Sequence, residues 1–341
     1  MRTLWLAVLG VVVLAGGWYF GPGANSGSRV VVPAGTLVFP GLAGKLQAAT
    51  MVEISNKGKT LRIARGKEFW GLADRGGYKV QQDKLREMLT GLTELRIIEP
   101  RTADPAQYDR LGVGDPNGAN STANLLRVLD ASGAPMAELI TGHRRVRTAG
   151  NLPETLYIRR PGEAQSWLAE GRVQVDADPQ LWFERDIVNI PLDRVASVVS
   201  RRGDAVLNFA KIDGKPALIQ VPDQPKLDDY KLEDVFRALA QLTLTDVAEA
   251  AKAPGEKIGD AVYTLNDGVR ITVTVARADK DIWIQLAAAG DGDAAKPAAA
   301  LQAGFAGWAF QLGAWKEKSF LPVMDDLKAE EPAKPVTPPS Q

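Results

Sequence analysis

The sequence predicts an α+β fold of two tandem related units, each a mostly antiparallel β-sheet with one principal covering helix, plus one N-terminal transmembrane helix. Two apolar stripes carry this prediction, because they repeat the one-sided spacing of a 3.6-residue period at a constant offset. Alternating apolar residues around a glycine turn precede each stripe, at Gly58 and at Gly203, and this pattern favours a β-hairpin. The stripes are Leu85, Met88, Leu89, Leu92 and Leu95, and then Leu232, Val235, Phe236, Leu239 and Leu242.

The bulk composition excludes several classes of function. At 341 residues the chain is long enough for two domains. Its 41 basic and 41 acidic residues balance, so no nucleic-acid partner is predicted. The absence of cysteine excludes disulfides, thiolate nucleophiles and zinc–cysteine sites. With a single histidine, His143, a two-histidine zinc site is impossible within one chain, and no cofactor or metal site is predicted.

The N-terminus predicts a membrane anchor over residues 1–21. Residues 4–20 are apolar, and about 17 helical residues span roughly 25 Å, slightly less than a ~30 Å hydrocarbon core. Arg2 and the terminal amine favour a cytoplasmic N-terminus, so the bulk of the chain is expected in the periplasm of a bacterium, anchored by a single pass in the inner membrane. A cleaved signal peptide and a buried soluble helix are the alternatives.

Composition divides the rest of the chain. Residues 22–36 read as a flexible tether rich in Gly, Ser and Pro. Residues 37–191 form the first predicted unit, and residues 192–325 the second. Within the second unit, residues 290–300 are predicted to be mobile and residues 305–315 to be helical. Residues 326–341 are expected to be a disordered, Pro-rich tail.

The most concentrated charge is a basic run that includes the only histidine. It consists of His143, Arg144, Arg145 and Arg147, and two further arginines fall on a predicted neighbouring strand, Arg159 and Arg160. Such a cluster could contact an anion or a lipid headgroup. The alternative is a solvated hairpin loop, since charge runs usually face water.

No catalytic motif is present in the sequence, so a non-enzymatic protein is predicted. There is no Gly-x-Ser-x-Gly turn, and the pair Asp228-Asp229 is explained as the cap of a helix. A hydrolase that uses carboxylates alone is a further alternative. Six tryptophans fall in strand or helix patterns, where core packing and carbohydrate stacking are both open. They are Trp70, Trp167, Trp182, Trp283, Trp308 and Trp315.

The order of several short motifs resembles the bacterial family of domain of unknown function 4340 (DUF4340), over most of residues 40–250. The motif at residues 112–116 departs from the family pattern, because Tyr108 is displaced from Gly112. The motifs are Trp70-Gly71-Leu72, the first apolar stripe, residues 112–116, residues 139–142, Leu156-Tyr157-Ile158-Arg159 and residues 182–187.

The resemblance implies a membrane-anchored accessory protein, because members are often encoded beside ABC-transporter components. It offers no catalytic residues. The leading hypothesis is therefore a non-enzymatic periplasmic interaction protein that assists an ABC-transporter-type or envelope complex. The alternative is a periplasmic module that binds glycan or peptidoglycan through exposed tryptophan.

Overall fold

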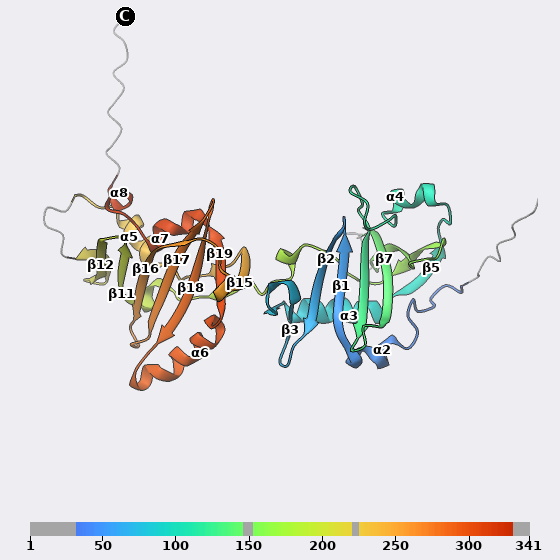
Figure 1. Ribbon diagram of the computed structural model, residues 1–341, viewed down its shortest axis with the longest axis horizontal. Helices are drawn as coiled ribbons and strands as arrows, with labels where there is room; N and C mark the ends of the chain where they lie inside the picture. The colour runs from blue at the N-terminus through green and yellow to red at the C-terminus, as the bar shows by residue number, and fades with distance from the viewer. Residues whose placement is uncertain (1–31, 146–152, 220–224, 330–341) are drawn as a thin grey trace, which may run out of the picture.

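The computed structural model describes residues 32–145, 153–219 and 225–329 (Figure 1). The predicted anchor at residues 4–20, most of the tether and most of the tail lie outside these residues. Within the described ranges, no helix combines the length and the apolar character that crossing a membrane requires.

The predicted α+β class is wrong. The described chain is mostly antiparallel β structure, arranged in sheets of nine, two and eight strands, with short helices against them. The sequence pattern overstated the length of both principal helices, because it extended the apolar stripes beyond Glu94 and Phe236, where α3 and α5 end. The domain boundaries at residues 191 and 325 stay predictions.

The nine-stranded sheet, here called the first sheet, has the order β4-β3-β2-β1-β6-β7-β8-β9-β5. Its helices are α2 (Leu42–Lys45), α3 (Gln82–Glu94) and α4 (Tyr108–Leu111). Its strands are β1 (Ala49–Asn56), β2 (Lys59–Arg65), β3 (Trp70–Leu72), β4 (Tyr78–Lys79), β5 (Arg96–Pro100), β6 (Asn124–Asp130), β7 (Pro135–Arg145), β8 (Thr155–Arg159) and β9 (Ser166–Glu170).

The eight-stranded sheet, here called the second sheet, has the order β13-β12-β11-β16-β17-β18-β19-β15. A separate small sheet pairs β10 (Asp186–Val188) with β14 (Leu242–Thr243). The helices of this half are α5 (Asp229–Phe236), α6 (Ala295–Phe305), α7 (Glu317–Phe320) and α8 (Met324–Leu327). The strands are β11 (Val195–Arg202), β12 (Ala205–Ile212), β13 (Lys215–Ile219), β15 (Asp246–Glu249), β16 (Glu256–Leu265), β17 (Arg270–Ala278), β18 (Asp281–Ala289) and β19 (Trp308–Gly313).

The two large sheets share one plan. If the extra strand β4 is set aside, β3-β2-β1-β6-β7-β8-β9-β5 corresponds strand for strand to β13-β12-β11-β16-β17-β18-β19-β15. The register of β1 shifts between Ala49 and Met51, and that of β11 shifts at the same place, between Val195 and Ser197. The predicted hairpins at Gly58 and Gly203 are confirmed as the β1–β2 and β11–β12 pairs.

The helices differ more than the sheets. In the first half, α3 buries Leu85, Met88 and Leu92, as its stripe predicts. In the second half, α5 ends at Phe236, and Gln241 has a left-handed backbone with φ 45° that no α-helix continues through. The last residue of that stripe, Leu242, therefore lies in β14 and not in a helix.

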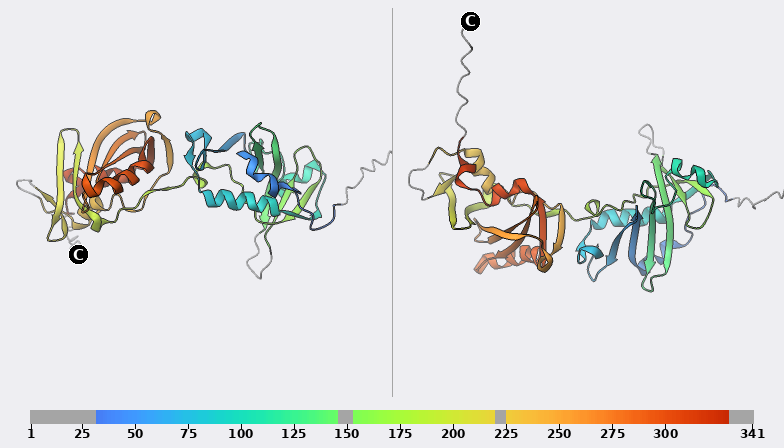
Figure 2. Two further views of the ribbon diagram at one scale, coloured as in Figure 1. Left: turned by 90° about the horizontal axis from the view of Figure 1, so that it is seen from below. Right: turned by 45° about the horizontal axis from the view of Figure 1, so that its top comes forward.

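The end of the second half contains the largest errors of secondary structure. Residues 295–305 form α6, which lies against β18, although residues 290–300 were predicted to be mobile. The predicted helix at residues 305–315 is mostly strand β19, which pairs with β18 on one side and β15 on the other. Figure 2 shows that α6 and α7 together lie against the second sheet, so one covering helix does not describe it.

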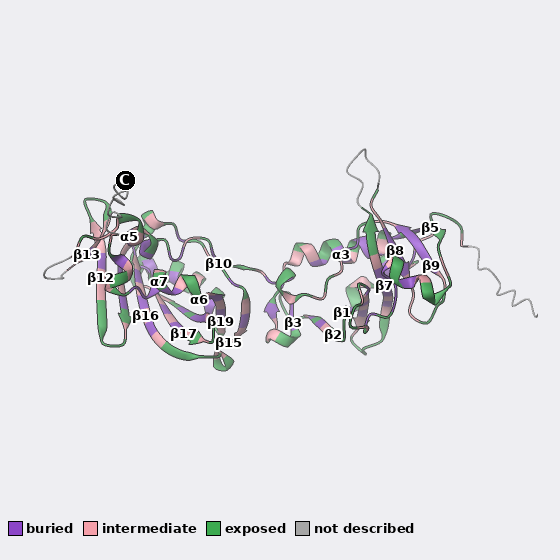
Figure 3. Ribbon diagram, turned by 90° about the horizontal axis from the view of Figure 1, so that it is seen from above, coloured by how far each residue is buried: buried purple, intermediate pink, exposed green. Residues whose placement is uncertain are grey.

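A packed contact, here called the seam, joins the two sheets near β4 and β15. At its centre, the buried ring of Tyr78 meets three aromatic rings edge-on, with centroid distances of 5.0 Å to Trp308, 6.2 Å to Phe183 and 6.2 Å to Phe310. The Tyr78 hydroxyl donates to the carbonyl oxygen of Glu184 at 3.0 Å, and burial raises the pKa of Tyr78 well above its ordinary value. One cluster of buried apolar residues has members in both sheets, and Figure 3 shows the buried residues of each sheet in purple.

An ion pair borders the same seam. The guanidinium of Arg75 donates to both carboxylate oxygens of Asp246, at 2.8 and 3.1 Å, a bidentate geometry that also raises the pKa of Arg75. Next to it, Gly76 has φ 66°, and a Cβ there would lie 2.6 Å from the side chain of Glu249. The positive φ favours glycine at this position, where the two halves approach closely.

Candidate functional site

A hollow of about 590 Å³ on the first sheet is lined by four arginines and a histidine, and we call it the basic hollow. It is built by the segment after β5, by α4 and the turn before it, and by facing parts of β7 and β8. Its lining residues are Arg101, Thr102, Gln107, Arg110, Leu111, His143, Arg144, Arg145 and Tyr157.

Two glycines bring the α4 segment onto β7. A Cβ at Gly142 would lie 2.2 Å from the carbonyl oxygen of Leu111, so only glycine fits there. Gly112 ends α4 with φ 69°, and its Cα lies against the ring of His143. The β7–β8 register shifts between Thr141 and Arg144, and such an irregularity changes the direction of the side chains at the end of β7.

The four arginines of the basic hollow fall into two groups, according to whether a carboxylate forms an ion pair with them. Arg101 forms an ion pair with Glu99, and Arg144 pairs with Glu154 at 2.5 Å. Arg110 donates to the neutral side chain of Gln107 at 3.1 Å. No carboxylate of the described residues is ion-paired with Arg110 or Arg145, and the lining itself contains no acidic residue.

The hollow has an aromatic wall. The guanidinium groups of Arg101 and Arg145 lie over the ring of Tyr157, 5.7 and 5.2 Å from its centroid. These are cation–π distances, so the ring of Tyr157 contacts both charged groups. The ring nitrogen Nε2 of His143 lies 3.2 Å from the hydroxyl oxygen of Thr122.

The residues predicted for an anion contact have three different outcomes. His143, Arg144 and Arg145 line the basic hollow, whereas Arg147 lies outside the described residues. Arg159 is used structurally: it donates to the carbonyl oxygen of Val113 at 3.0 Å. Arg160 is also structural, because it donates to the carbonyl oxygen of Val38 at 2.7 Å.

Sequence reasoning missed Arg101, Arg110 and Tyr157. Arg101 and Arg110 come from segments far from residues 143–145 in the chain, and no local pattern signals their approach, whereas Tyr157 lies on β8, the neighbouring strand that carries Arg159. The Tyr157 strand was recognised only as a structural motif.

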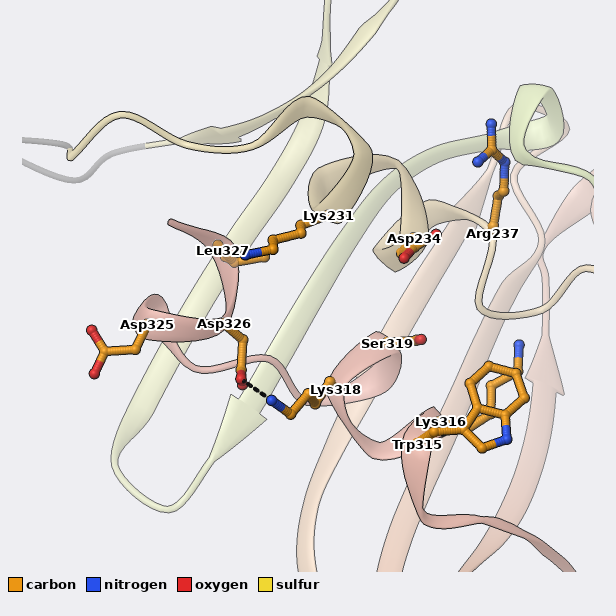
Figure 4. Close-up of a pocket in the computed structure, with 10 residues that line it drawn as sticks. All are labelled: Lys231, Asp234, Arg237, Trp315, Lys316, Lys318, Ser319, Asp325, Asp326 and Leu327. Carbon is orange, nitrogen blue, oxygen red and sulfur yellow. Dashed lines mark ion pairs between the residues drawn. The ribbon is translucent and has the colours of Figure 1, made fainter. Parts of the chain in front are cut away.

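A second hollow, of about 480 Å³, lies beside α5, α7 and α8, and we call it the Trp315 hollow (Figure 4). The Trp315 side chain is 71% exposed there, and the ammonium of Lys316 lies 5.0 Å from its ring centroid. Lys316 donates to the carbonyl oxygen of Ala238 at 3.0 Å, and burial lowers the pKa of Lys316. On the opposite wall, Lys318 and Asp326 are ion-paired at 2.8 Å.

The tryptophans separate into two groups. Trp167, Trp182 and Trp283 are buried, and Trp70 and Trp308 are half-buried, so core packing explains them. Trp315 alone among these six is exposed. In the described ranges, no three potential metal-ligating side chains come together. Asp228 caps α5, as predicted, by accepting from the backbone nitrogen of Tyr230 at 2.9 Å.

The sequence matches one family model. The model of the domain of unknown function DUF4340 matches residues 70–266, which is more than half of the chain and includes parts of both large sheets. This match confirms the resemblance seen in the order of the motifs. No curated protein matches the sequence.

Proposed function

The chain belongs to the DUF4340 family, and on that premise we propose that it is a non-enzymatic interaction protein of the bacterial envelope. Residues 4–20 hold it at the inner membrane, and its two sheets face the periplasm. There it acts as an accessory component of an ABC-transporter-type or envelope complex. The observation that carries the proposal is the seam.

The seam couples two surfaces in one body. The basic hollow belongs to the first sheet and the Trp315 hollow to the second, and the buried Tyr78 ring and the Arg75–Asp246 pair join the sheets between them. Two surfaces at a fixed separation bind two partners, or two parts of one partner, with a high effective concentration for the second contact. That property suits an accessory subunit that bridges components of a complex.

In-cell crosslinking tests this proposal. A C-terminally tagged chain is crosslinked, extracted from membranes and analysed by mass spectrometry. We expect reproducible recovery of transporter or envelope subunits with the unmodified chain and with Tyr230→Ala, a control at a 79% exposed tyrosine. Recovery should fall with Tyr78→Ala, which opens the seam. If the chain is recovered alone in every case, the proposal is wrong.

A second candidate function has one observation in its favour. The exposed ring of Trp315 stands among lysine, aspartate and serine side chains, a combination that suits stacking and hydrogen bonding to a sugar. The Trp315 hollow would then bind glycan or peptidoglycan. Sedimentation with purified peptidoglycan tests it: Trp315→Ala should lower binding about tenfold, and Phe69→Ala, at an exposed aromatic of the first half, should leave it unchanged. Equal binding by all three chains contradicts this function.

A further inference from the structure

We propose that the basic hollow binds the phosphate group of an organic phosphate ester. This inference rests on the proposed function, because it names a ligand class for one surface of the same interaction protein. It is carried by the number of arginines, by their unequal pairing and by the volume and apolar wall of the hollow.

The number of arginines favours phosphate over a carboxylate. A guanidinium presents several N–H donors in a planar fork that fits two oxygens of an oxyanion. Four such forks line the hollow. One carboxylate has only two oxygens, whereas a phosphate group offers more oxygens around a tetrahedral centre and can accept from several forks at once.

The pairing of the arginines separates positioning groups from free ones. Glu99 and Glu154 restrain Arg101 and Arg144, so these two lose little side-chain freedom when a ligand arrives. Arg110 and Arg145 carry charges that the described carboxylates do not neutralise. An incoming dianion or monoanion would therefore be attracted mainly by Arg110 and Arg145, and oriented by the other two.

The volume indicates that the phosphate is part of a larger molecule. About 590 Å³ is within the range of small-molecule pockets and exceeds what a single inorganic ion fills. Tyr157 and Leu111 provide an apolar wall beside the arginines. A phospholipid headgroup and a soluble phosphate monoester both present a phosphate beside an organic part.

Calorimetric titration of the full chain in neutral-detergent micelles tests the inference and separates the two sources. The probes are glycerol 3-phosphate, short-chain phosphatidylglycerol and, as a zwitterionic comparison, short-chain phosphatidylcholine. Arg110→Gln and Arg145→Gln should each weaken binding of the preferred probe about tenfold, because each removes a charged hydrogen-bonding fork. Arg86→Gln is the matched control: it also removes one positive charge, but from the exposed surface of α3.

Each outcome decides the matter. If the chain binds glycerol 3-phosphate and the double variant, with both Arg110→Gln and Arg145→Gln, does not, the ligand is a soluble ester. If the double variant loses only the binding of phosphatidylglycerol, the ligand is a lipid headgroup. The inference is overturned if no probe binds, if the double variant binds as well as the unmodified chain, or if Arg86→Gln weakens binding equally. Crosslinking that still recovers envelope subunits would then leave the proposed function standing, whereas phosphate binding without such partners would refute that function alone.

Discussion

The two large sheets have the same strand order but different outward side chains at matched positions. On the face of the first sheet that points away from the core, charges alternate across neighbouring strands: Glu53 pairs with Arg62 at 3.2 Å and with Arg127 at 4.0 Å, and Arg127 pairs with Glu138 at 2.8 Å. At the matching positions of the second sheet the side chains are uncharged: Val199 in β11 lies opposite Val262 in β16. Thr272 in β17 and Ala287 in β18 continue the same row. Backbone pairing thus sets the strand order, while the outward side chains are free to differ.

The inward faces differ at one matched position. Ile54 in β1 lies two residues after the buried Val52, and Ser200 in β11 lies two residues after the buried Val198. Both Ile54 and Ser200 are buried. The Ser200 hydroxyl donates to the carbonyl oxygen of Phe320 in α7 at 3.1 Å. The second sheet therefore accepts a polar residue in its core because a helix end provides a hydrogen-bond partner for it.

The largest effect is expected where the two sheets meet. Tyr78→Ala should lower the free energy of unfolding by about 3–5 kcal/mol, because it removes a buried ring from an aromatic cluster. It should also divide one urea transition into two, followed by tryptophan fluorescence. Tyr78→Phe keeps the ring and loses only the hydrogen bond to Glu184, so it should cost about 1 kcal/mol. A single transition in Tyr78→Ala would show that the sheets remain coupled without the seam.

A matched pair of core substitutions sharpens the comparison. Leu92→Ala beside the first sheet and Leu239→Ala beside the second are fully buried positions of the two stripes, and each should cost about 2–5 kcal/mol. In the Tyr78→Ala background, each substitution should shift only the transition of its own sheet. If either substitution shifts both transitions equally there, the sheets do not unfold separately.

Alkaline pH should act on both sides of the comparison. Burial raises the pKa of Tyr78 at the seam and of Tyr263 in the second sheet. The unfolded chain releases these protons near pH 10, before the folded chain does. Their contribution to stability is therefore complete below about pH 10 and falls above it, by up to about 1.4 kcal/mol per pH unit for each tyrosine. Urea unfolding as a function of pH should show a shallower fall in Tyr263→Phe; an identical slope would contradict this.

The smallest effect is expected at the charged outer face. Glu53→Gln removes the carboxylate shared by Arg62 and Arg127, both about half exposed, so the free energy of unfolding should fall by less than about 1 kcal/mol. Arg201→Gln, which loses one pair with Asp260 on the second sheet, should cost less still. Both effects should vanish near 1 M salt, where the Debye length is about 3 Å. A salt-independent loss would mean that packing, not charge, is responsible.

Local patterns predicted the local parts of this fold. The glycine turns at Gly58 and Gly203 gave the two hairpins, and the apolar stripes identified core residues even where, as at Leu242, the element was wrong. The alanine-rich α6 was missed because its apolar face is mostly small: Ala298 and Phe305 are its buried residues. The strand order could not be deduced, since it depends on pairings between distant segments.

The candidate site divides in the same way. The run His143-Arg144-Arg145 is contiguous and was found by its charge. Arg110 joins it only because Gly142 and Gly112 allow α4 to rest on β7, a contact that no spacing encodes. Conversely, Arg159 and Arg160 were predicted as anion contacts because of their charge, although both side chains donate hydrogen bonds to backbone carbonyl oxygens.

The seam joins unlike ends of two like sheets, since β15 of the second meets the turn beside β4 of the first. Such a head-to-tail contact does not close on itself and can continue into a filament. The strand of the first sheet equivalent to β15 is β5, and residues 35–38 already cover its outer edge: the backbone nitrogen of Gly35 donates to Ile97 at 2.7 Å and that of Val38 to Leu95 at 2.8 Å. Residues 35–38 thus cover the edge at which a further sheet would add, and a covered edge does not pair with another chain.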